Sequence, residues 1–148
     1  MKRRIPLSRQ PVTIGHQVGY MQRAFPKFKY SRPNNVPTWY GPLQPTGTSP
    51  IYTVKIVYRF AGRRSKHPKV WVKSPEISSD APHCYSDGSL CLYFPQDGDW
   101  TPYKYVYETI VPWAALWLAF YEIWLDTDHW YGLEAPHTGA KRQVTEIS

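Results

Sequence analysis

Cysteine is scarce in this sequence, and segments that define several common protein classes are missing. Only two of the 148 residues are cysteine. The first residues, Met1 to Arg4, lack the apolar region that a secretory signal would contain. Few cysteines without such a signal indicate a reducing, cytoplasmic compartment. The sequence also has no internal repeat and no low-complexity segment.

A long hydrophobic run is missing as well. The most apolar stretch, Ile110 to Leu125, is shorter than the roughly 20 residues that a membrane-spanning helix requires. It also contains Pro112 and Glu122. A buried core helix explains this segment better, so no association with a membrane is expected.

The positive charge is concentrated rather than spread along the chain. The formal net charge is +7, and basic residues gather at Lys2–Arg4 and Arg63–Lys69. A solvated tail and a solvated hairpin tip account for such groups, while a surface for an acidic partner is the alternative. Because the sequence has no helix-turn-helix pattern and no RNA-binding aromatic motif, nucleic acid is not expected as the main ligand.

Apolar and aromatic residues are abundant. Hydrophobic residues make up 42% and aromatic residues 16% of the chain, which is enough apolar surface to form a packed core. The length fits a single domain over residues 1–148, and we expect loose tails at 1–12 and 138–148. Fifteen prolines break the chain into short extended pieces and turns.

The first half of the chain predicts a helix followed by an antiparallel sheet. Residues Thr13 to Phe25 have apolar side chains at helical spacing before Pro26, and the stretch Pro33–Pro50 predicts a short strand and a turn. Alternation predicts a strand over Ile51–Phe60, and Lys69–Lys73 predicts the next one. Because the connections are too short for crossover helices, the strands form a meander. The first of these two strands has five residues on one face: Tyr52, Val54, Ile56, Tyr58 and Phe60.

The second half predicts an irregular segment and then helices. Residues Ser74 to Thr101 show no sustained period and contain both cysteines, and such a long irregular segment is usually functional. Thr101 and Pro102 are typical of a helix start, and we expect this helix to kink or restart at Pro112. Its second piece is expected to cover the sheet with an apolar stripe, formed by Trp113, Leu116, Trp117, Phe120, Tyr121 and Trp124. These elements together predict an α+β fold.

The irregular segment contains a motif that carries chemistry. Gly88-Ser89-Leu90-Cys91-Leu92 is followed by Trp100-Thr101-Pro102, and here the sequence resembles the E2 ubiquitin-conjugating superfamily. The pattern of that family has Cys-Leu after a loop with glycine, then Trp-Ser/Thr-Pro. The resemblance implies an E2 (UBC-like) fold and a catalytic Cys91 that holds an acyl group as a thioester, for which a thiol is the natural nucleophile.

The His-Pro-Asn triad of the family is altered in this chain. Aligned on Cys91, the triad falls on Ala81-Pro82-His83, so a histidine replaces the asparagine that is credited with supporting the loop and stabilising the oxyanion. His83 could donate a hydrogen bond to the same place, or act as an acid or base because imidazole titrates near neutral pH. We therefore predict that Cys91 and His83 are catalytic. Four further residues are expected to shape the site, the last on family pattern alone: Tyr85, Gly88, Trp100 and His137.

Longer motifs indicate a bacterial branch of this superfamily. Four segments are similar to the E2-like proteins of bacterial anti-phage operons, the CBASS systems, which also contain cGAS-like nucleotidyltransferases. The resemblance covers residues 36–137, and its segments are Trp39–Pro45, Thr109–Trp113, Tyr121–Trp124 and Trp130–His137. It implies that the acyl group is the C-terminal carboxylate of the nucleotidyltransferase, conjugated to an unidentified target to prime signalling. No cofactor is implied, and because no adenylation motif or Gly-rich phosphate loop is present, activation by ATP must occur elsewhere or be bypassed.

Other interpretations of the two cysteines stay open. Cys91 lies between two leucines and could be a small buried hydrophobe, which is the default for an intracellular cysteine. Cys84 is expected to be structural. A metal site that combines His83 and both cysteines with His129 or His137 matches no usual zinc spacing, so no metal is expected.

Two acidic residues follow Cys91 in the sequence. Asp97 and Asp99 are expected in a solvated turn around Gly98, although either could orient an incoming amine. The main alternative to an enzyme is a non-catalytic, E2-shaped scaffold that binds the nucleotidyltransferase. The missing asparagine is the feature that favours this scaffold.

Overall fold

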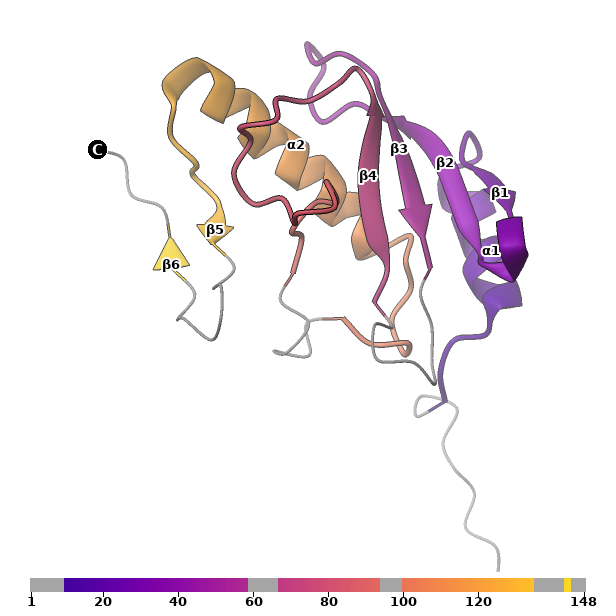
Figure 1. Cartoon of the computed structure of the whole chain (residues 1–148). Coiled ribbons are helices and arrows are strands. Elements are labelled where there is room, and N and C mark those ends of the chain that lie inside the picture. The colour runs from indigo at the N-terminus through magenta and orange to yellow at the C-terminus, as the bar shows by residue number, and fades with distance from the viewer. Residues whose placement is uncertain (1–9, 59–66, 94–99, 135–142, 145–148) are drawn as a thin grey trace, which may run out of the picture.

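The computed structural model describes residues 10–58, 67–93, 100–134 and 143–144 (Figure 1). Its main sheet is antiparallel with the strand order β1-β2-β3-β4, and two short strands, β5 and β6, pair separately. This arrangement confirms the predicted α+β class and the antiparallel meander. The elements in chain order are α1 (Ile14–Ala24), β1 (Lys29–Ser31), the 3₁₀ helix η2 (Pro33–Asn35), β2 (Thr38–Leu43), β3 (Tyr52–Val57), β4 (Lys69–Ser74), α2 (Ile110–Thr127), β5 (Leu133–Glu134) and β6 (Gln143–Val144).

Strand β3 lies in the interior of the sheet between β2 and β4. The alternation predicted for this strand is confirmed, because Tyr52, Val54 and Ile56 are buried, as is Tyr58 just beyond its end. Phe60, the fifth residue of the predicted face, lies outside the described residues. The buried face of β3 thus forms the floor on which the helices pack.

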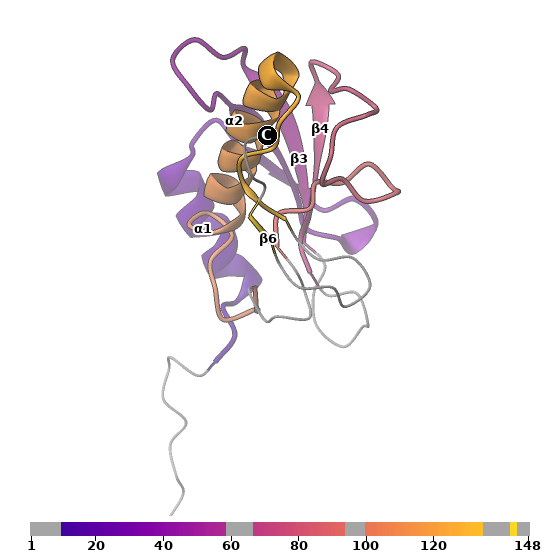
Figure 2. The same cartoon turned by 90° about the vertical axis from the view of Figure 1, so that its left-hand side faces the viewer.

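Helix α1 begins and ends where the sequence predicts, within two residues. The side chain of Thr13 accepts a hydrogen bond from the backbone N–H of His16 at 3.1 Å, which caps the helix. Gln17 and Met21 are the buried residues of this helix. Both α1 and α2 lie on one face of the main sheet (Figures 1 and 2).

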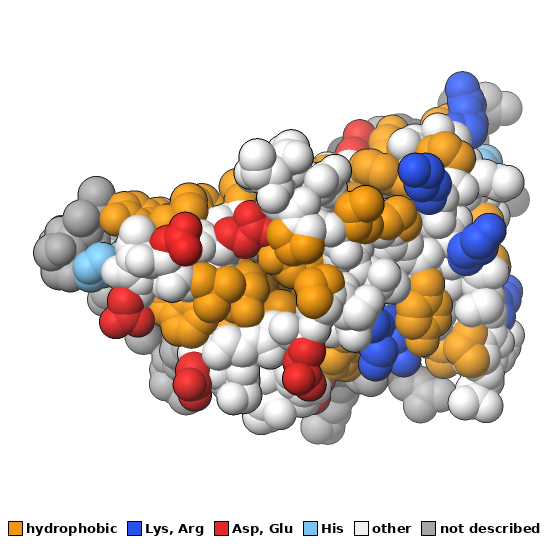
Figure 3. All heavy atoms as spheres, turned by 90° about the horizontal axis from the view of Figure 1, so that it is seen from above, with side chains coloured by type: hydrophobic (Ala, Val, Ile, Leu, Met, Phe, Trp, Pro, Cys, Tyr) orange, Lys and Arg blue, Asp and Glu red, His pale blue; other side chains and the backbone are white. Residues whose placement is uncertain are grey.

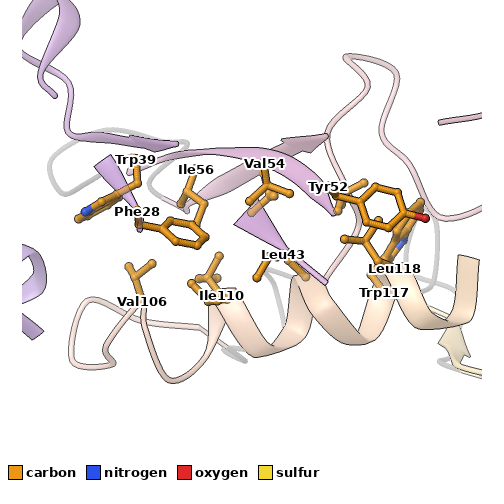
Figure 4. Close-up of a cluster of buried hydrophobic side chains, with 14 of the residues drawn as sticks. Phe28, Trp39, Leu43, Tyr52, Val54, Ile56, Val106, Ile110, Trp117 and Leu118 are labelled. Carbon is orange, nitrogen blue, oxygen red and sulfur yellow. The ribbon is translucent and has the colours of Figure 1, made fainter. Parts of the chain in front are cut away.

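Helix α2 covers the inner face of the sheet. Figure 4 shows Ile110 directed from the helix toward Ile56 of β3, and Trp117 and Leu118 beside Tyr52 of the same strand. The buried residues of the helix are Ile110, Val111, Ala114, Trp117, Leu118 and Tyr121. Removal of this apolar surface from water is the dominant favourable contribution to such packing.

The apolar stripe predicted for α2 is confirmed for Trp117 and Tyr121, which are buried, and is wrong for Leu116. Leu116, placed in the stripe, is 54% exposed, and Trp113, Phe120 and Trp124 are only half-buried. The helix is apolar on most of its circumference, so its helical period cannot determine which side faces the sheet. The buried side of α2 is rotated about the helix axis relative to the predicted stripe, and Trp113, Phe120 and Trp124 lie along the border of the buried side.

The predicted helix over Thr101–Val111 is also wrong, because regular helix begins only at Ile110. The buried side chain of Gln17 donates to the carbonyl of Lys104 and accepts from the N–H of Val106, both at 2.9 Å. Tertiary hydrogen bonds thus satisfy backbone groups that a helix would otherwise satisfy.

Of the two effects predicted for Pro112, a kink or a restart of the helix, the structure is closer to the restart, because α2 begins at Ile110. Pro112 is the third residue of α2, where a backbone N–H has no partner within the helix. Its missing donor therefore costs no hydrogen bond.

Several sequence expectations concern parts of the chain with little description. The basic residues Lys2–Arg4 and 63–66 lie outside the described residues. Of the expected tails, Val12 donates its N–H to the carbonyl of Pro102 at 2.9 Å, and Gln143 and Val144 pair with β5. Among the described side chains seen in Figure 3, acidic residues gather at one end of the molecule and Lys and Arg at the other, with apolar side chains between them.

Helix α2 is the longest helix within the described ranges, and no helix there is long and apolar enough to cross a bilayer.

Glu122, in the second half of α2, accepts hydrogen bonds from the hydroxyls of Ser49 at 2.7 Å and Tyr52 at 2.8 Å. Glu122, the charged residue within the apolar run, therefore links α2 to Ser49, which lies between β2 and β3, and to Tyr52, the first residue of β3.

Two leucines of α2 provide a matched test of this packing. Leu118 is fully buried and Leu125 is 54% exposed. We expect Leu118→Ala to lower the free energy of unfolding by about 2–5 kcal/mol because it leaves a cavity. Leu125→Ala should change it by no more than about 0.5 kcal/mol. Urea denaturation of both variants measures the difference, and equal losses would contradict the orientation of α2.

Candidate active site

A short hairpin carries the cysteine of the family motif. Cys84 and Leu90 form an isolated antiparallel bridge, and the N–H of Cys91 donates to the carbonyl of His83 at 2.8 Å. Leu90 in turn donates its N–H to the carbonyl of Val70 in β4 at 2.8 Å. The hairpin is thereby attached to the edge strand of the sheet, and Cys91 follows directly after the attachment point.

The turn of the hairpin is held by a carboxylate. Asp87 accepts from both the N–H and the hydroxyl of Ser89, at 2.9 Å and 2.6 Å, and from the ammonium group of Lys69 at 2.6 Å. The indole N–H of Trp71 donates to the carbonyl of Asp87 at 3.0 Å. Gly88 has φ +87°, a conformation that favours glycine. The predicted role of Gly88 is thus a backbone role in this turn.

These contacts act on the acidity of Asp87. Burial alone would raise the pKa of this carboxyl, but the hydrogen bonds from Lys69 and Ser89 outweigh it and lower the pKa from 3.8 to about 2. A lowered pKa in the folded state means that the stabilisation is complete above about pH 4 and is lost as the pH falls through about 2. The side chain of Asp87 is 40% exposed, so the pair contributes less than about 1 kcal/mol.

His83 links the hairpin to helix α2. Its backbone has φ +57°, in the left-handed region where histidine, asparagine and aspartate are enriched among non-glycine residues. Its carbonyl accepts a second hydrogen bond, from the indole N–H of Trp117 at 3.1 Å. The imidazole ring packs on Trp130 with ring centroids 4.9 Å apart.

The Tyr85 side chain reaches the sulfur of the motif. Burial raises the pKa of Tyr85 above its usual value, and a side-chain hydrogen bond with Cys91 raises it further. The hydroxyl also lies 3.4 Å from the carbonyl of Tyr93. The hydroxyl of Tyr85 thus interacts with both the side chain of Cys91 and the backbone of Tyr93.

The two thiols have different surroundings. Cys84 packs against the hydrophobic core, and burial, with a smaller contribution from the charge of Cys91, raises its pKa to about 11. A thiol with such a pKa is almost fully protonated near neutral pH and is a poor nucleophile. Cys91 is half-buried and faces a pocket instead.

The pocket beside Cys91 has a volume of about 300 Å³. Its walls come from the cysteine segment, from α2 and from the turn after α2. The lining residues are Cys91, Leu92, Trp113, Leu116, Trp117, Phe120, Trp130, Tyr131 and Gly132. Among these described residues none is charged, so the pocket is apolar and mainly aromatic.

The structure brings together some of the predicted site residues and separates others. His83, Tyr85 and Gly88 belong to the same hairpin as Cys91. Trp100 is 1% exposed; its indole donates to Thr109 and its ring packs on Tyr58, and it does not line the pocket. His137, Asp97 and Asp99 lie outside the described residues.

Sequence reasoning missed the wall of the pocket. Trp113, Leu116 and Phe120 were assigned to the core, and Tyr131 and Gly132 were noted only as part of a family motif. The wide apolar surface of α2 could have indicated this wall. A helix with apolar side chains on more than one face can pack on the sheet with one face and line a pocket with another. Within the described part of the chain, no group of three His, Cys, Asp or Glu residues is placed to hold a metal ion.

A comparison with protein families matches residues 17–138 to the family described as "Type II CBASS E2 protein". No curated protein matches the chain. The matched range includes the hairpin, the pocket, the whole of α2 and helix α1 from Gln17 onward.

The acidity of Asp87 provides a test of the hydrogen bonds that Asp87 accepts from Lys69 and Ser89. We expect an NMR titration of the Asp87 carboxyl to give a pKa of about 2 in the unmodified protein. In Lys69→Met the pKa should rise toward its usual value, because one hydrogen bond and the favourable charge are lost. Lys73→Met on the same strand is the control. An Asp87 pKa that is the same in Lys69→Met and in the unmodified protein would contradict the contact between Lys69 and Asp87.

Proposed function

Because this chain belongs to the family of Type II CBASS E2 proteins, with a role in the CBASS system, we propose that it is a conjugating enzyme whose nucleophile is Cys91. The sulfur attacks an activated carbonyl, a thioester bond forms, and the activating group leaves with the electron pair of the broken bond. An amine then attacks the thioester, an amide bond forms, and Cys91 regains its proton. The order of elements supports an E2 (UBC-like) fold: an N-terminal helix, an antiparallel meander, the cysteine segment and a later helix.

The acyl donor in this proposal is the C-terminus of a cGAS-like nucleotidyltransferase. The family resemblance supports this choice, and conjugation to a target would prime anti-phage signalling. The donor must arrive in activated form, since the chain has no motif for adenylation.

The position of Cys91 carries the proposal. Cys91 lines an apolar pocket and interacts with the side chain of Tyr85, while its backbone N–H is fixed by His83. Cys84, seven residues earlier, does not line the pocket, and burial raises its pKa to about 11. A thiol that is accessible, fixed and supported by a donor is what thioester formation requires.

His83 is proposed as the second catalytic residue. Its carbonyl positions Cys91, and its ring lies on Trp130, which is part of the pocket wall. An imidazole near the thioester carbonyl would donate a hydrogen bond to the oxyanion that develops during attack by the amine. This role would replace that of the family asparagine.

The first test of the function compares the two cysteines. A synthetic peptide with the C-terminal sequence of the partner nucleotidyltransferase, supplied as a thioester, replaces the activated donor. We expect Cys84→Ala to form an adduct at the normal rate and Cys91→Ala to form none, with both proteins folded. The adduct is followed by mass spectrometry. An added thiol such as dithiothreitol should release it by exchange, in which the acyl group moves to the added thiol and the Cys91 sulfur leaves.

Two outcomes would contradict this assignment. Adduct formation by folded Cys91→Ala would remove Cys91 as the nucleophile. Failure of the unmodified protein to form any adduct, while it still binds the nucleotidyltransferase, would indicate the E2-shaped scaffold instead.

The second test separates the side chain of His83 from its backbone. Alanine is strained at φ +57°, whereas glycine and asparagine tolerate that conformation. We expect His83→Gly to slow transfer from a preformed Cys91 adduct by about 10²–10³, the usual effect of losing one oxyanion donor. His83→Asn should recover part of this rate.

Single-turnover transfer to a lysine-containing peptide is the measurement, with the folded fraction determined by circular dichroism. Normal transfer by folded His83→Gly would exclude the ring from the mechanism. A loss of rate that follows the folded fraction would leave His83 with the backbone role alone.

A further inference from the structure

The apolar pocket has a feature that thioester formation alone does not explain. Cys91 forms part of its wall, and the other lining residues are all uncharged and mainly aromatic, which is a surface for an apolar group. Building on the proposed function, we propose that this pocket binds a large apolar side chain from one of the last two residues of the acyl donor. The pocket would thus select donors by the side chain next to the reacting carbonyl.

The donor fits this pocket better than the acceptor for a geometric reason. Once Cys91 is charged, the carbonyl carbon of the donor is bonded to its sulfur, so the adjoining residues of the donor must start at the pocket wall. An incoming lysine would bring an ammonium or amine group into walls that contain no charged residue among those described. Such a group would lose hydration without gaining a partner.

The shape of the pocket is fixed before any ligand arrives. Trp117 and Trp130 pack with ring centroids 5.3 Å apart, and Phe120 packs on Trp130 at 5.9 Å. Trp117 is also anchored by its hydrogen bond to His83. At Gly132 a Cβ atom would lie 2.8 Å from the ring of Phe120, so glycine allows this wall to close. A preformed wall binds its ligand without paying for its own ordering.

The size and exposure of the pocket agree with a single side chain. A volume of about 300 Å³ lies at the lower end for small-ligand sites. Leu116, which lines the pocket, is 54% exposed, so an apolar group in the pocket would cover surface that now contacts water. Removal of such surface from water is the expected source of binding free energy.

The experiment uses the full chain and a set of peptide thioesters of one sequence. Leucine or serine occupies the last position or the one before it, and each rate of Cys91 charging is divided by the rate of the same peptide with N-acetylcysteine. In each reaction the Cys91 sulfur forms the new thioester and the original thiol leaves. We expect leucine at one of the two positions to charge Cys91 about tenfold faster than serine, as discrimination by hydrophobic pockets allows.

Two leucines of α2 with the same exposure supply the matched variants. Leu116 lines the pocket and Leu125 does not, and each is 54% exposed. We expect Leu116→Asp to reduce the leucine-to-serine ratio at least about threefold, because a carboxylate in the wall penalises an apolar ligand. Leu125→Asp should keep the ratio of the unmodified protein.

Each remaining outcome decides the question. Equal normalised rates for all peptides, with Cys91 charged, would overturn the pocket assignment and leave the proposed function intact. A preference for leucine that Leu116→Asp does not change would also overturn it, because the selection would occur elsewhere. Absence of charging by every peptide would overturn both the pocket assignment and the thioester function.

Discussion

The carbonyl oxygen of His83 accepts two hydrogen bonds, one from the backbone N–H of Cys91 and one from the indole of Trp117. The first bond fixes Cys91 within its hairpin, and the second fixes that hairpin to helix α2. Because α2 also supplies four of the nine residues that line the pocket, these two bonds determine where Cys91 lies relative to the pocket. The left-handed backbone of His83 sets the direction of the shared carbonyl.

Trp117 transmits the packing of the core to this site. It is buried on the inner side of α2 and stacks on Tyr121, and its indole N–H nevertheless reaches the hairpin. Buried tryptophans commonly combine a large apolar surface with one hydrogen bond. The same side chain therefore contributes to the stability of the sheet–helix interface and to the geometry of the site, so the position of the pocket follows from the position of α2 on the sheet.

The sequence was sufficient wherever local chemistry decides the structure. Alternation identified β3, and Thr13 and Pro26 bounded α1. The motif around Cys91 pointed to residues that the structure places in one hairpin, although this segment was predicted to be irregular. It was insufficient where distant residues decide. The segment before α2 is not helical because Gln17, nearly ninety residues away, binds its backbone groups, and propensity contains no information about such a partner. The face of α2 was ambiguous for a related reason: apolar residues surround the helix, and the hairpin and the turn after α2 determine which of them line the pocket.

The substitution of histidine for the family asparagine has two separable consequences. Both residues tolerate the left-handed backbone found at position 83, so the carbonyl that holds Cys91 and Trp117 can keep its direction with either. The side chains differ, because an amide does not titrate near neutral pH and an imidazole does. The exchange therefore allows the same backbone contacts of Cys91 and Trp117 while it changes the chemistry available beside the pocket wall at Trp130.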